Sequence, residues 1–312
     1  MMYDLIGDIH GHATELKALL TKMDYRETDG VWQHPERIVI FLGDFVDRGP
    51  EQVETVTIAR NMVEGGQALA VMGNHEFNAV TWATADPQNP GESLRPHIDK
   101  NLKQHREFLE QVGEGSELHH SMIEWFKTLP VYLDLPEFRV VHACWHPGHL
   151  AAIADYTDSD NRLLPGAWEA ASQEGSAAYE AIETLLKGLE VPLPGDHHFF
   201  DKYEQKRTNI RTKWWRQGEL TYRDLAMVPG NVINQIPHEP VAAHVLPGYD
   251  GKKPVFVGHY WMSGKPAPLS KHVACLDYSI AGDNGGKLCA YRWGGENELT
   301  EASYCYVSRH RS

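Results

Sequence analysis

Short apolar runs of strand length alternate, in the first part of the chain, with segments whose apolar residues recur at roughly helical spacing. Residues 3–6, 38–42 and 68–72 form the apolar runs. Between them, residues 16–23 and 53–62 predict two amphipathic helices that pack on a sheet. The order strand, helix, strand, helix, strand predicts a parallel α/β arrangement. Runs that are apolar throughout are typical of parallel strands buried on both faces.

The next part of the chain first becomes polar and then returns to strands. Residues 77–130 have a helical and polar pattern that ends at a proline. Residues 131–136 and 138–142 then predict a hairpin, because two apolar runs are joined by a proline-containing turn.

The periodicity weakens from residue 147 to residue 250, and we interpret this segment as an inserted, mostly helical cap. An apolar strand pattern returns at residues 254–257. The tail then alternates in short runs that we expect to form the edge of a second sheet, namely residues 273–278, 288–293 and 302–307.

Composition indicates a folded protein without a membrane span. Of the 312 residues, 42% are apolar and 23% are charged, which is ordinary for a globular chain with a sizeable core. No run approaches the roughly 20 apolar residues that a membrane helix needs. The N-terminus enters a strand without a basic leader, which predicts a cytoplasmic location. The four cysteines are widely spaced and form no C-x-x-C pair, which argues against a disulfide scaffold and a structural zinc site.

The formal net charge of −14 disfavours a nucleic-acid binder, because such proteins neutralise phosphates with Lys and Arg. This charge does not exclude phosphate-containing substrates. Bound divalent cations can supply positive charge locally.

Polar side chains that suit chemistry follow five of the predicted strands. Because ligand and catalytic groups of α/β sheets gather at the carboxyl ends of strands, we expect these side chains to lie together. A single histidine at a strand end is more often a structural residue, but five such ends in one chain form a pattern. The side chains are Asp8, His10, Asp44, Asp47, Asn74, His75, His142 and His259.

The motifs that contain these residues resemble those of the calcineurin-like metallophosphoesterases, in the branch of the serine/threonine phosphoprotein phosphatases and their bacterial relatives. The motifs are GDIHG at 7–11, GDFVDRG at 43–49, GNHE at 73–76, VHA at 141–143 and GH at 258–259. The resemblance implies a four-layer αββα sandwich of two mixed sheets flanked by helices. It also implies one domain over residues 1–312, with the cap at about 147–250 as an insertion.

The resemblance further implies a centre of two divalent metal ions. Asp44 would bridge the ions, because two cations about 3.5 to 4 Å apart need a shared anionic ligand. Asp8 and His10 would complete one site, and Asn74, His142 and His259 the other. Mixed carboxylate, amide and imidazole ligands favour Mn²⁺, with Fe or Zn²⁺ as alternatives. A hydroxide bridging the two metals would attack phosphorus.

Three further residues acquire catalytic roles from the resemblance. His75 would donate a proton to the leaving oxygen, and Asp47 would orient the imidazole of His75. Arg48 would bind two phosphate oxygens through its planar guanidinium. The alternatives are that Arg48 is a surface residue paired with Glu51, and that Asp47 and His75 are structural only.

One position departs from many members of the family. A second histidine often follows the last one as Gly-His-x-His, whereas Trp261 stands there in this chain. The missing ligand would leave the first metal with three protein ligands plus water, as in the phosphoprotein-phosphatase branch. We interpret Trp261 as a core aromatic residue, with a wall of the substrate pocket as the alternative.

The function expected from these features is metal-dependent hydrolysis of phosphate monoesters, with a phosphorylated protein or a small phosphate compound as substrate. The alternative is hydrolysis of dinucleoside polyphosphates such as diadenosine tetraphosphate, with an adenosine pocket formed by Trp214, Trp215 or Tyr222 of the cap. The other interpretation of these three aromatics is that they form the core of the cap. The histidine pairs at 119–120 and 197–198 are expected on the surface. A nuclease and a non-catalytic metal-binding scaffold are less favoured. No nucleic-acid or membrane partner is expected, and the oligomeric state is not determined by the sequence.

Overall fold

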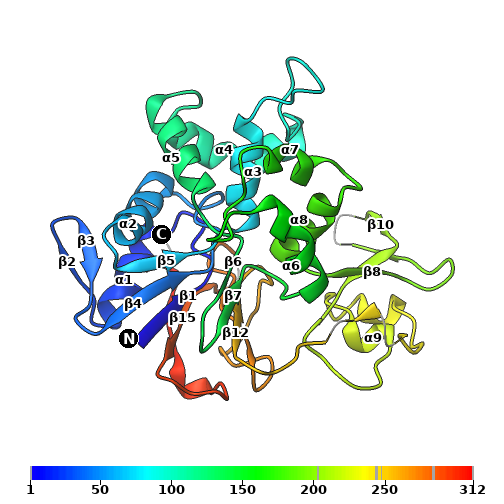
Figure 1. The fold of residues 1–312 in the computed structure, drawn as a ribbon. Helices are drawn as coiled ribbons and strands as arrows, with labels where there is room; N and C mark the ends of the chain where they lie inside the picture. The colour runs from blue at the N-terminus through cyan, green and yellow to red at the C-terminus, as the bar shows by residue number, and fades with distance from the viewer. Residues whose placement is uncertain (1, 202–203, 243–244, 247, 283–284, 311–312) are drawn as a thin grey trace.

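The computed structural model describes residues 2–201, 204–242, 245–246, 248–282 and 285–310, and two stacked sheets form its centre (Figure 1). In spatial order the six-stranded sheet contains β14 (Asp277–Tyr278), β15 (Lys287–Trp293), β1 (Met2–Ile6), β4 (Arg37–Phe41) and β5 (Ala68–Ala70), and β16 (Tyr304–Ser308) also pairs with β15. Strands β1, β4 and β5 run parallel, as predicted, and β15 runs antiparallel to β1. This sheet is therefore mixed.

The second sheet has four strands, in the order β13 (Val273–Cys275), β12 (Val255–Val257), β7 (Arg139–Val141) and β6 (Tyr132–Asp134). Strand β12 runs parallel to both of its neighbours, and β6 and β7 form the predicted hairpin.

The prediction for the tail is only partly right. Strand β13 does lie at an edge of the second sheet, but β14, β15 and β16 belong to the first sheet. The reason is register, because β15 continues the first sheet beside β1, pairing Tyr3 with Trp293 and Ile6 with Ala290. The alternating pattern of a short strand shows that one face of the strand is buried. It does not show which of the two sheets the strand joins.

Neighbouring residues of one strand face opposite sides of the sheet, and both sides are buried. Leu5 and Ile40 of the first sheet belong to the apolar layer between the sheets, with Val140 and Phe256 of the second sheet. Ile6, next to Leu5, belongs instead to the apolar cluster that includes helical residues. This arrangement explains why the strands are apolar throughout rather than alternating.

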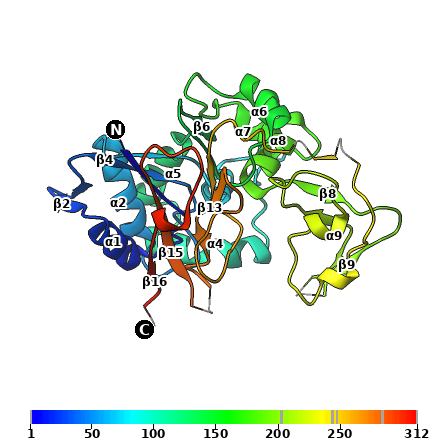
Figure 2. The same ribbon diagram turned by 90° about the horizontal axis from the view of Figure 1, so that it is seen from below.

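Helices cover the outer faces of both sheets (Figures 1 and 2). Helix α1 (Ala13–Lys22) contacts β15 and β16, and α2 (Gln52–Glu64) contacts β5. Beyond the second sheet lie α6 (Pro147–Ile153), α7 (Ala167–Ser172) and α8 (Ala177–Lys187), which contact one another through α8. The layer order is helix, sheet, sheet, helix, as expected for an αββα sandwich.

The longer helices of segment 147–250 lie in its first part, and short strand pairs and two short helices follow. These pairs are β8 (Glu190–Pro192) with β11 (Asn209–Arg211), and β9 (Phe199–Phe200) with β10 (Lys206–Arg207). Positions 202–203, 243–244 and 247 of the expected cap lie outside the described residues. The remaining elements are β2 (Arg26–Thr28), β3 (Val31–Gln33), α3 (Asn74–Ala83), α4 (Asp99–Val112), α5 (Glu117–Lys127), η1 (Ala154–Tyr156), α9 (Tyr222–Leu225), η2 (Ile233–Gln235) and η4 (Glu301–Ser303). Over the described part of the chain, no helix combines the length and apolar character needed to cross a bilayer.

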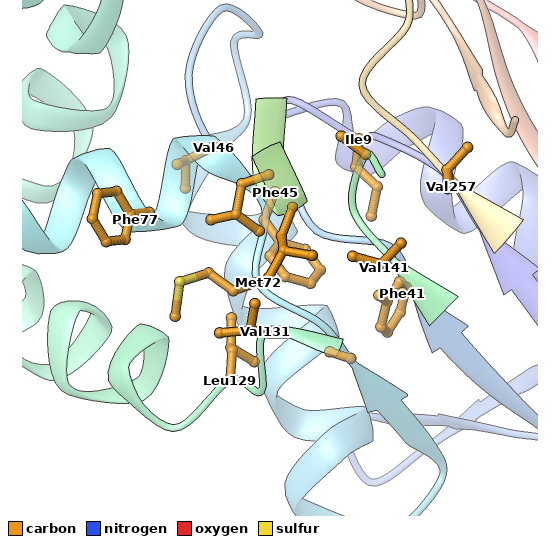
Figure 3. Packing of buried hydrophobic residues seen from close by; sticks show 14 of the residues in the cluster. Ile9, Phe41, Phe45, Val46, Met72, Phe77, Leu129, Val131, Val141 and Val257 are labelled. Carbon is orange, nitrogen blue, oxygen red and sulfur yellow. The ribbon is translucent and has the colours of Figure 1, made fainter. Parts of the chain in front are cut away.

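Buried apolar side chains hold the loops that leave the strands (Figure 3). Ile9, Phe45 and Val46 lie in the loops after β1 and β4, and Val141 and Val257 end β7 and β12. All five side chains are fully buried. Each polar residue at a strand end therefore has an apolar neighbour packed into the core, which fixes the direction in which the polar side chain points.

Candidate metal centre

Six side chains meet where strands of both sheets end. Five of them are at most 7% exposed and His259 is partly exposed. They are the six that the sequence predicts as metal ligands, namely Asp8 and His10 after β1, Asp44 after β4, Asn74 at the start of α3, His142 after β7 and His259 after β12. The structure thus brings together residues up to 251 positions apart, as the hydrogen bond from His259 N to Asp8 Oδ2 shows.

The carboxylate of Asp44 lies in the middle of this set. Its Oδ2 atom is 3.7 Å from His10 Nε2, 3.3 Å from His142 Nε2 and 3.9 Å from His75 Nε2. Two groups of donor atoms share Asp44, and in each group the atoms lie within 4.8 Å of one another: His10, Asp44 and His75, and Asp44, His142 and His259. These distances between donor atoms are longer than ordinary hydrogen bonds. They suit ligand atoms that surround one metal ion, each at about 2 Å from that ion.

Several of the expected ligand atoms are buried without a hydrogen-bond partner among the described residues. The other ring nitrogens of two histidines are fixed, because His10 Nδ1 donates to Val46 O at 2.9 Å and His142 Nδ1 to Leu42 O at 2.6 Å. A carbonyl only accepts, so in the neutral imidazole that a metal ion binds the proton stays on Nδ1 and Nε2 offers its lone pair. Unpartnered buried polar atoms are costly, and this donor set therefore fits divalent metal ions. The unpartnered atoms are Asp8 Oδ1, His10 Nε2, His142 Nε2 and His259 Nε2.

Negative charge accumulates in the centre. Burial and the carboxylate of Asp277 raise the pKa of Asp8 well above its usual value. Burial also opposes ionisation of Asp44, but His142 and His75 hold the pKa of Asp44 well below its usual value. Burial favours neutral His142, yet the charge of Asp44 raises the pKa of His142 to about 10. The raised pKa values of Asp8 and His142 show that the buried carboxylates favour positive charge at this place. Bound metal cations would relieve the repulsion between these carboxylates.

The predicted pair His75 and Asp47 is in contact, and a second histidine shares the carboxylate. His75 Nδ1 lies 2.5 Å from Asp47 Oδ2, and His105 Nδ1 lies 2.6 Å from Asp47 Oδ1. Burial opposes ionisation of Asp47, but His105 and His75 hold its pKa below the usual value. Burial lowers the pKa of His75, and the charges of Asp44 and Asp47 outweigh that effect and raise it. The sequence analysis missed His105, since a lone histidine on the polar helix α4 gives no signal.

Two buried carboxylates that the sequence analysis also missed hold the loops in place. Glu76 accepts from the backbone N–H groups of Gly73 at 3.0 Å, Asp44 at 2.8 Å and Phe45 at 2.8 Å. Asp277 accepts from the backbone N–H group of Trp261 at 2.7 Å. Burial and the nearby Asp44 raise the pKa of Glu76 to about 7. Glu76 stands in the GNHE motif, so its position in that motif was the available signal.

The backbone of the centre is unusual. Non-glycine residues adopt positive φ angles at His10 (48°), Asp44 (53°), Asp47 (69°) and His259 (69°). Such conformations cost free energy and cluster at functional sites, where packing enforces them. Glycine is needed at position 73, because a Cβ atom there would lie 2.2 Å from Asp44 Oδ1.

Arg48 is exposed and lies over an aromatic ring rather than beside Glu51. Its guanidinium is 4.5 Å from the ring centre of Trp261. Glu51 instead accepts from the backbone N–H of Thr14 at 2.8 Å and from its hydroxyl at 2.5 Å. Trp261 is 39% exposed, so its interpretation as a core aromatic is wrong. The ring belongs to the surface beside the metal centre.

The expected adenosine pocket and one histidine assignment need correction. Trp214 and Trp215 are 0% and 8% exposed, and Trp214 Nε1 donates to Tyr260 Oη at 2.9 Å. Both indoles are therefore core residues and leave no room for a nucleoside between them. His119, expected on the surface, is also buried, where it packs against Phe108.

The profile of the family described as calcineurin-like phosphoesterase matches residues 1–256. This match extends over most of the chain. It includes every residue of the centre except His259, which lies just after it. The chain therefore belongs to the calcineurin-like phosphoesterase family, a family of hydrolases.

Curated relatives match a shorter stretch. The asymmetrical bis(5'-nucleosyl)-tetraphosphatase PrpE of Bacillus velezensis is 43% identical over 146 residues, which are 46% of this chain and 56% of that protein. The same enzyme of Bacillus subtilis is 30% identical over 148 residues, 46% of this chain and 57% of that protein. The symmetrical bis(5'-nucleosyl)-tetraphosphatase of Shewanella sediminis is 29% identical over 143 residues, 45% of this chain and 43% of that protein. The chain thus spans about half the length of the curated relatives it matches.

Two solved structures share the fold over the whole chain. A candidate diadenosine tetraphosphatase has a TM-score of 0.50 at 16% identity, covering 100% of this chain and 95% of that one. A protein serine/threonine phosphatase from Saccharomyces cerevisiae has a TM-score of 0.51 at 14% identity, covering 100% and 80%. At these identities the likeness establishes the fold only.

Proposed function

We propose that the protein is a two-metal hydrolase that cleaves the phosphoanhydride chain of dinucleoside polyphosphates. The observation that carries the hydrolase assignment is the set of buried, unpartnered donor atoms around Asp44. The dinucleotide substrate is favoured by the names of the matched relatives, which are bis(5'-nucleosyl)-tetraphosphatases. The phosphoprotein-phosphatase reading rests on the branch resemblance of the motifs, together with a fold likeness at 14% identity, so we rank it second.

In this proposal Asp44 holds both ions. Asp8 and His10 would hold one of them, and Asn74, His142 and His259 the other. When bound, two divalent ions supply Lewis acidity and neutralise the charge of the phosphates. We propose Mn²⁺ as the ion in use, with Fe or Zn²⁺ as alternatives, because the donors are carboxylate, amide and imidazole without any thiolate.

The remaining residues act on the phosphate and on the leaving oxygen. The oxygen of a water molecule bonds to phosphorus and that water loses a proton to solvent. The bond from phosphorus to the oxygen that joins it to the next phosphate breaks, and that oxygen leaves with the electron pair. His75, held by Asp47, stands ready to donate a proton to that oxygen. The exposed guanidinium of Arg48 can bind two oxygens of the attacked phosphate. The leaving group is a nucleoside phosphate, which is a weak base because its protonated form has a pKa of about 6. A proton from His75 therefore matters less for this substrate than for an alkyl ester.

The proposal is tested with the metal-stripped protein, with and without added Mn²⁺. The substrates are diadenosine tetraphosphate and a phosphoserine peptide, and the products are separated by anion-exchange chromatography. Mn²⁺-dependent cleavage of the dinucleotide supports the proposal, and the products also identify the bond, since two ADP indicate symmetrical cleavage and ATP with AMP asymmetrical cleavage. Release of phosphate from the peptide alone would establish the second reading instead.

We also propose that residues 147–250 are an insertion into one phosphoesterase domain. Strands β7 and β12 are parallel neighbours in one sheet, and the chain leaves the sheet after β7 and returns to it at β12. Helix α8 of this segment packs at the end of β7, where Ala143 N donates to Leu185 O at 2.9 Å. One cooperative calorimetric transition is expected for the metal-loaded protein, and two separate transitions would contradict a single domain.

A further inference from the structure

A cleft of about 1140 Å³ opens beside the metal centre. Its walls come mainly from residues 199–201, residues 206–213, residues 226–233 and residues 259–263. The last stretch contains His259, so the cleft and the metal centre share a wall. Ligand pockets commonly enclose about 300 to 1,000 Å³, and this cleft therefore has room for a nucleotide.

The lining of the cleft carries more positive than negative charge. Arg207 pairs with Asp201 at 2.8 Å, and Arg211 lies 3.6 Å from Glu190. Two cations remain in excess, in a chain whose formal net charge is −14. A local reversal of charge in a cleft favours an anionic ligand. The charged lining residues are Lys206, Arg207, Arg211, Lys213, Glu190 and Asp201.

Arg211 connects the cleft to the metal centre. Its side chain lines the cleft together with His259 of the metal centre, so both face the same space. The Nε atom of Arg211 is buried and has no hydrogen-bond partner among the described residues. A guanidinium with a free N–H group at this position can bind a phosphate adjacent to the one under attack.

Trp261 forms the boundary between the two regions. Its indole lines the cleft, is 39% exposed and lies under the guanidinium of Arg48. The ring of His10 is 6.2 Å from it on the side of the metal centre. An exposed indole offers a flat surface on which a nucleobase can stack, whichever base it is.

We propose that this cleft binds the nucleotide that leaves during hydrolysis, with its phosphates along the cationic side chains and its base against Trp261. The inference rests on the proposed function and extends it, because nothing in the matched motifs assigns a residue of segment 188–250. A phosphopeptide would place one phosphate at the metal centre and would not require this second set of cations. A dinucleoside polyphosphate carries further phosphates that do.

The first test is a double variant, Lys206→Gln with Arg207→Gln, in the Mn²⁺-loaded protein. Both residues lie on the exposed strand β10, so the substitutions leave the core intact. The measured quantity is the ratio of kcat/KM for diadenosine tetraphosphate to kcat/KM for p-nitrophenyl phosphate. We expect this ratio to fall about tenfold, because the aryl ester does not reach the cleft. The double variant Lys252→Gln with Lys271→Gln, two exposed lysines outside the cleft lining, is the control of equal charge change and should alter the ratio less than twofold.

The second test uses ADP and inorganic pyrophosphate as inhibitors of p-nitrophenyl phosphate hydrolysis. ADP should inhibit the wild type more strongly than pyrophosphate does, and Trp261→Leu should abolish that difference. Either an unchanged substrate ratio in the double variant or equal inhibition by ADP and pyrophosphate in the wild type would overturn the inference. A ratio that falls for an acidic phosphopeptide but not for the dinucleotide would also overturn it.

The two proposals fail in different ways. A wild type that hydrolyses p-nitrophenyl phosphate but not the dinucleotide refutes the proposed function, whatever the inhibitors show. A wild type that hydrolyses both substrates, with the same ratio in the double variant, refutes only the role of the cleft.

Discussion

The metal centre and the segment 188–250 are built in opposite ways. The side chains of the centre follow central strands of two sheets, and apolar neighbours such as Ile9 and Phe45 fix them (Figure 3). The segment instead contains strands of two or three residues and two short helices, and both residues of β10 are exposed. The rigid part can hold ions and protons at fixed positions, whereas exposed cations can adapt to a substrate. In the proposed function, chemistry and substrate choice are therefore carried by different kinds of structure.

The similarities to known proteins differ in extent from one comparison to another. The family profile matches residues 1–256, but the match to a relative such as that of Bacillus velezensis covers 46% of this chain. A hydrolytic centre is common to proteins that act on different phosphate compounds, and specificity depends on the surroundings of that centre. The substitutions below separate the two regions, beginning with the largest expected effect.

Asp44→Asn should abolish the centre. The substitution removes the anionic charge that both groups of donor atoms share, so we expect both ions to bind weakly and activity to fall by roughly a thousandfold or more. Metal content after gel filtration and turnover of p-nitrophenyl phosphate are the measurements. Wild-type activity with both ions retained would show that Asp44 is not the shared ligand.

His75→Asn should slow turnover while the ions stay bound. Loss of a general acid costs roughly a hundredfold or more where the leaving oxygen needs a proton. We therefore expect a loss of about a hundredfold for an alkyl phosphate and a smaller one for p-nitrophenyl phosphate or a phosphoanhydride. Equal losses on alkyl and aryl esters would exclude His75 as the proton donor.

His105→Leu should have a smaller effect of the same kind. The substitution removes one of the two imidazoles that contact Asp47, and a hydrogen bond to a buried charge contributes about 1.5 to 3 kcal/mol. We expect roughly a tenfold fall in alkyl phosphate turnover, with His105→Asn, which keeps an N–H donor, closer to the wild type. A loss that is the same for alkyl and aryl esters in both variants would show that His105 has a structural role only.

Lys213→Gln, in the cleft, should change substrate affinity and leave the centre unaltered. A single partly exposed cation contributes little at physiological salt, so we expect a two- to threefold rise in KM for diadenosine tetraphosphate. The rise should shrink as NaCl is added, and the metal content should equal that of the wild type. A loss of bound metal in this variant would erase the distinction between the two regions.

The sequence predicted which side chains lie together at the strand ends, and the reason is physical. Asp8, His10, Asp44, His142 and His259 each follow an apolar strand, and parallel strands bring their carboxyl ends to one edge. His105 and Asp277 could not be found this way, because their partners lie elsewhere in the chain and no spacing connects them. Their contributions depend on tertiary contacts alone.

The mistakes share another cause. Trp214, Trp215 and Trp261 are the same residue type, yet two are buried and one is exposed beside Arg48, since burial depends on packing and not on hydrophobicity. Strand β15 was assigned to the wrong sheet because its alternation specifies a face and not a partner. The cleft was missed because segment 188–250 has no periodic pattern.

The central claim is that one carboxylate, Asp44, joins two ions in a single centre. Electron paramagnetic resonance of the Mn²⁺-loaded protein tests it most directly, because two Mn²⁺ ions about 3.5 to 4 Å apart interact magnetically. We predict the spectrum of a coupled pair at two equivalents of Mn²⁺ per chain, and its loss in Asp44→Asn. The spectrum of isolated Mn²⁺ at every loading, or a coupled pair that survives in Asp44→Asn, would contradict the account.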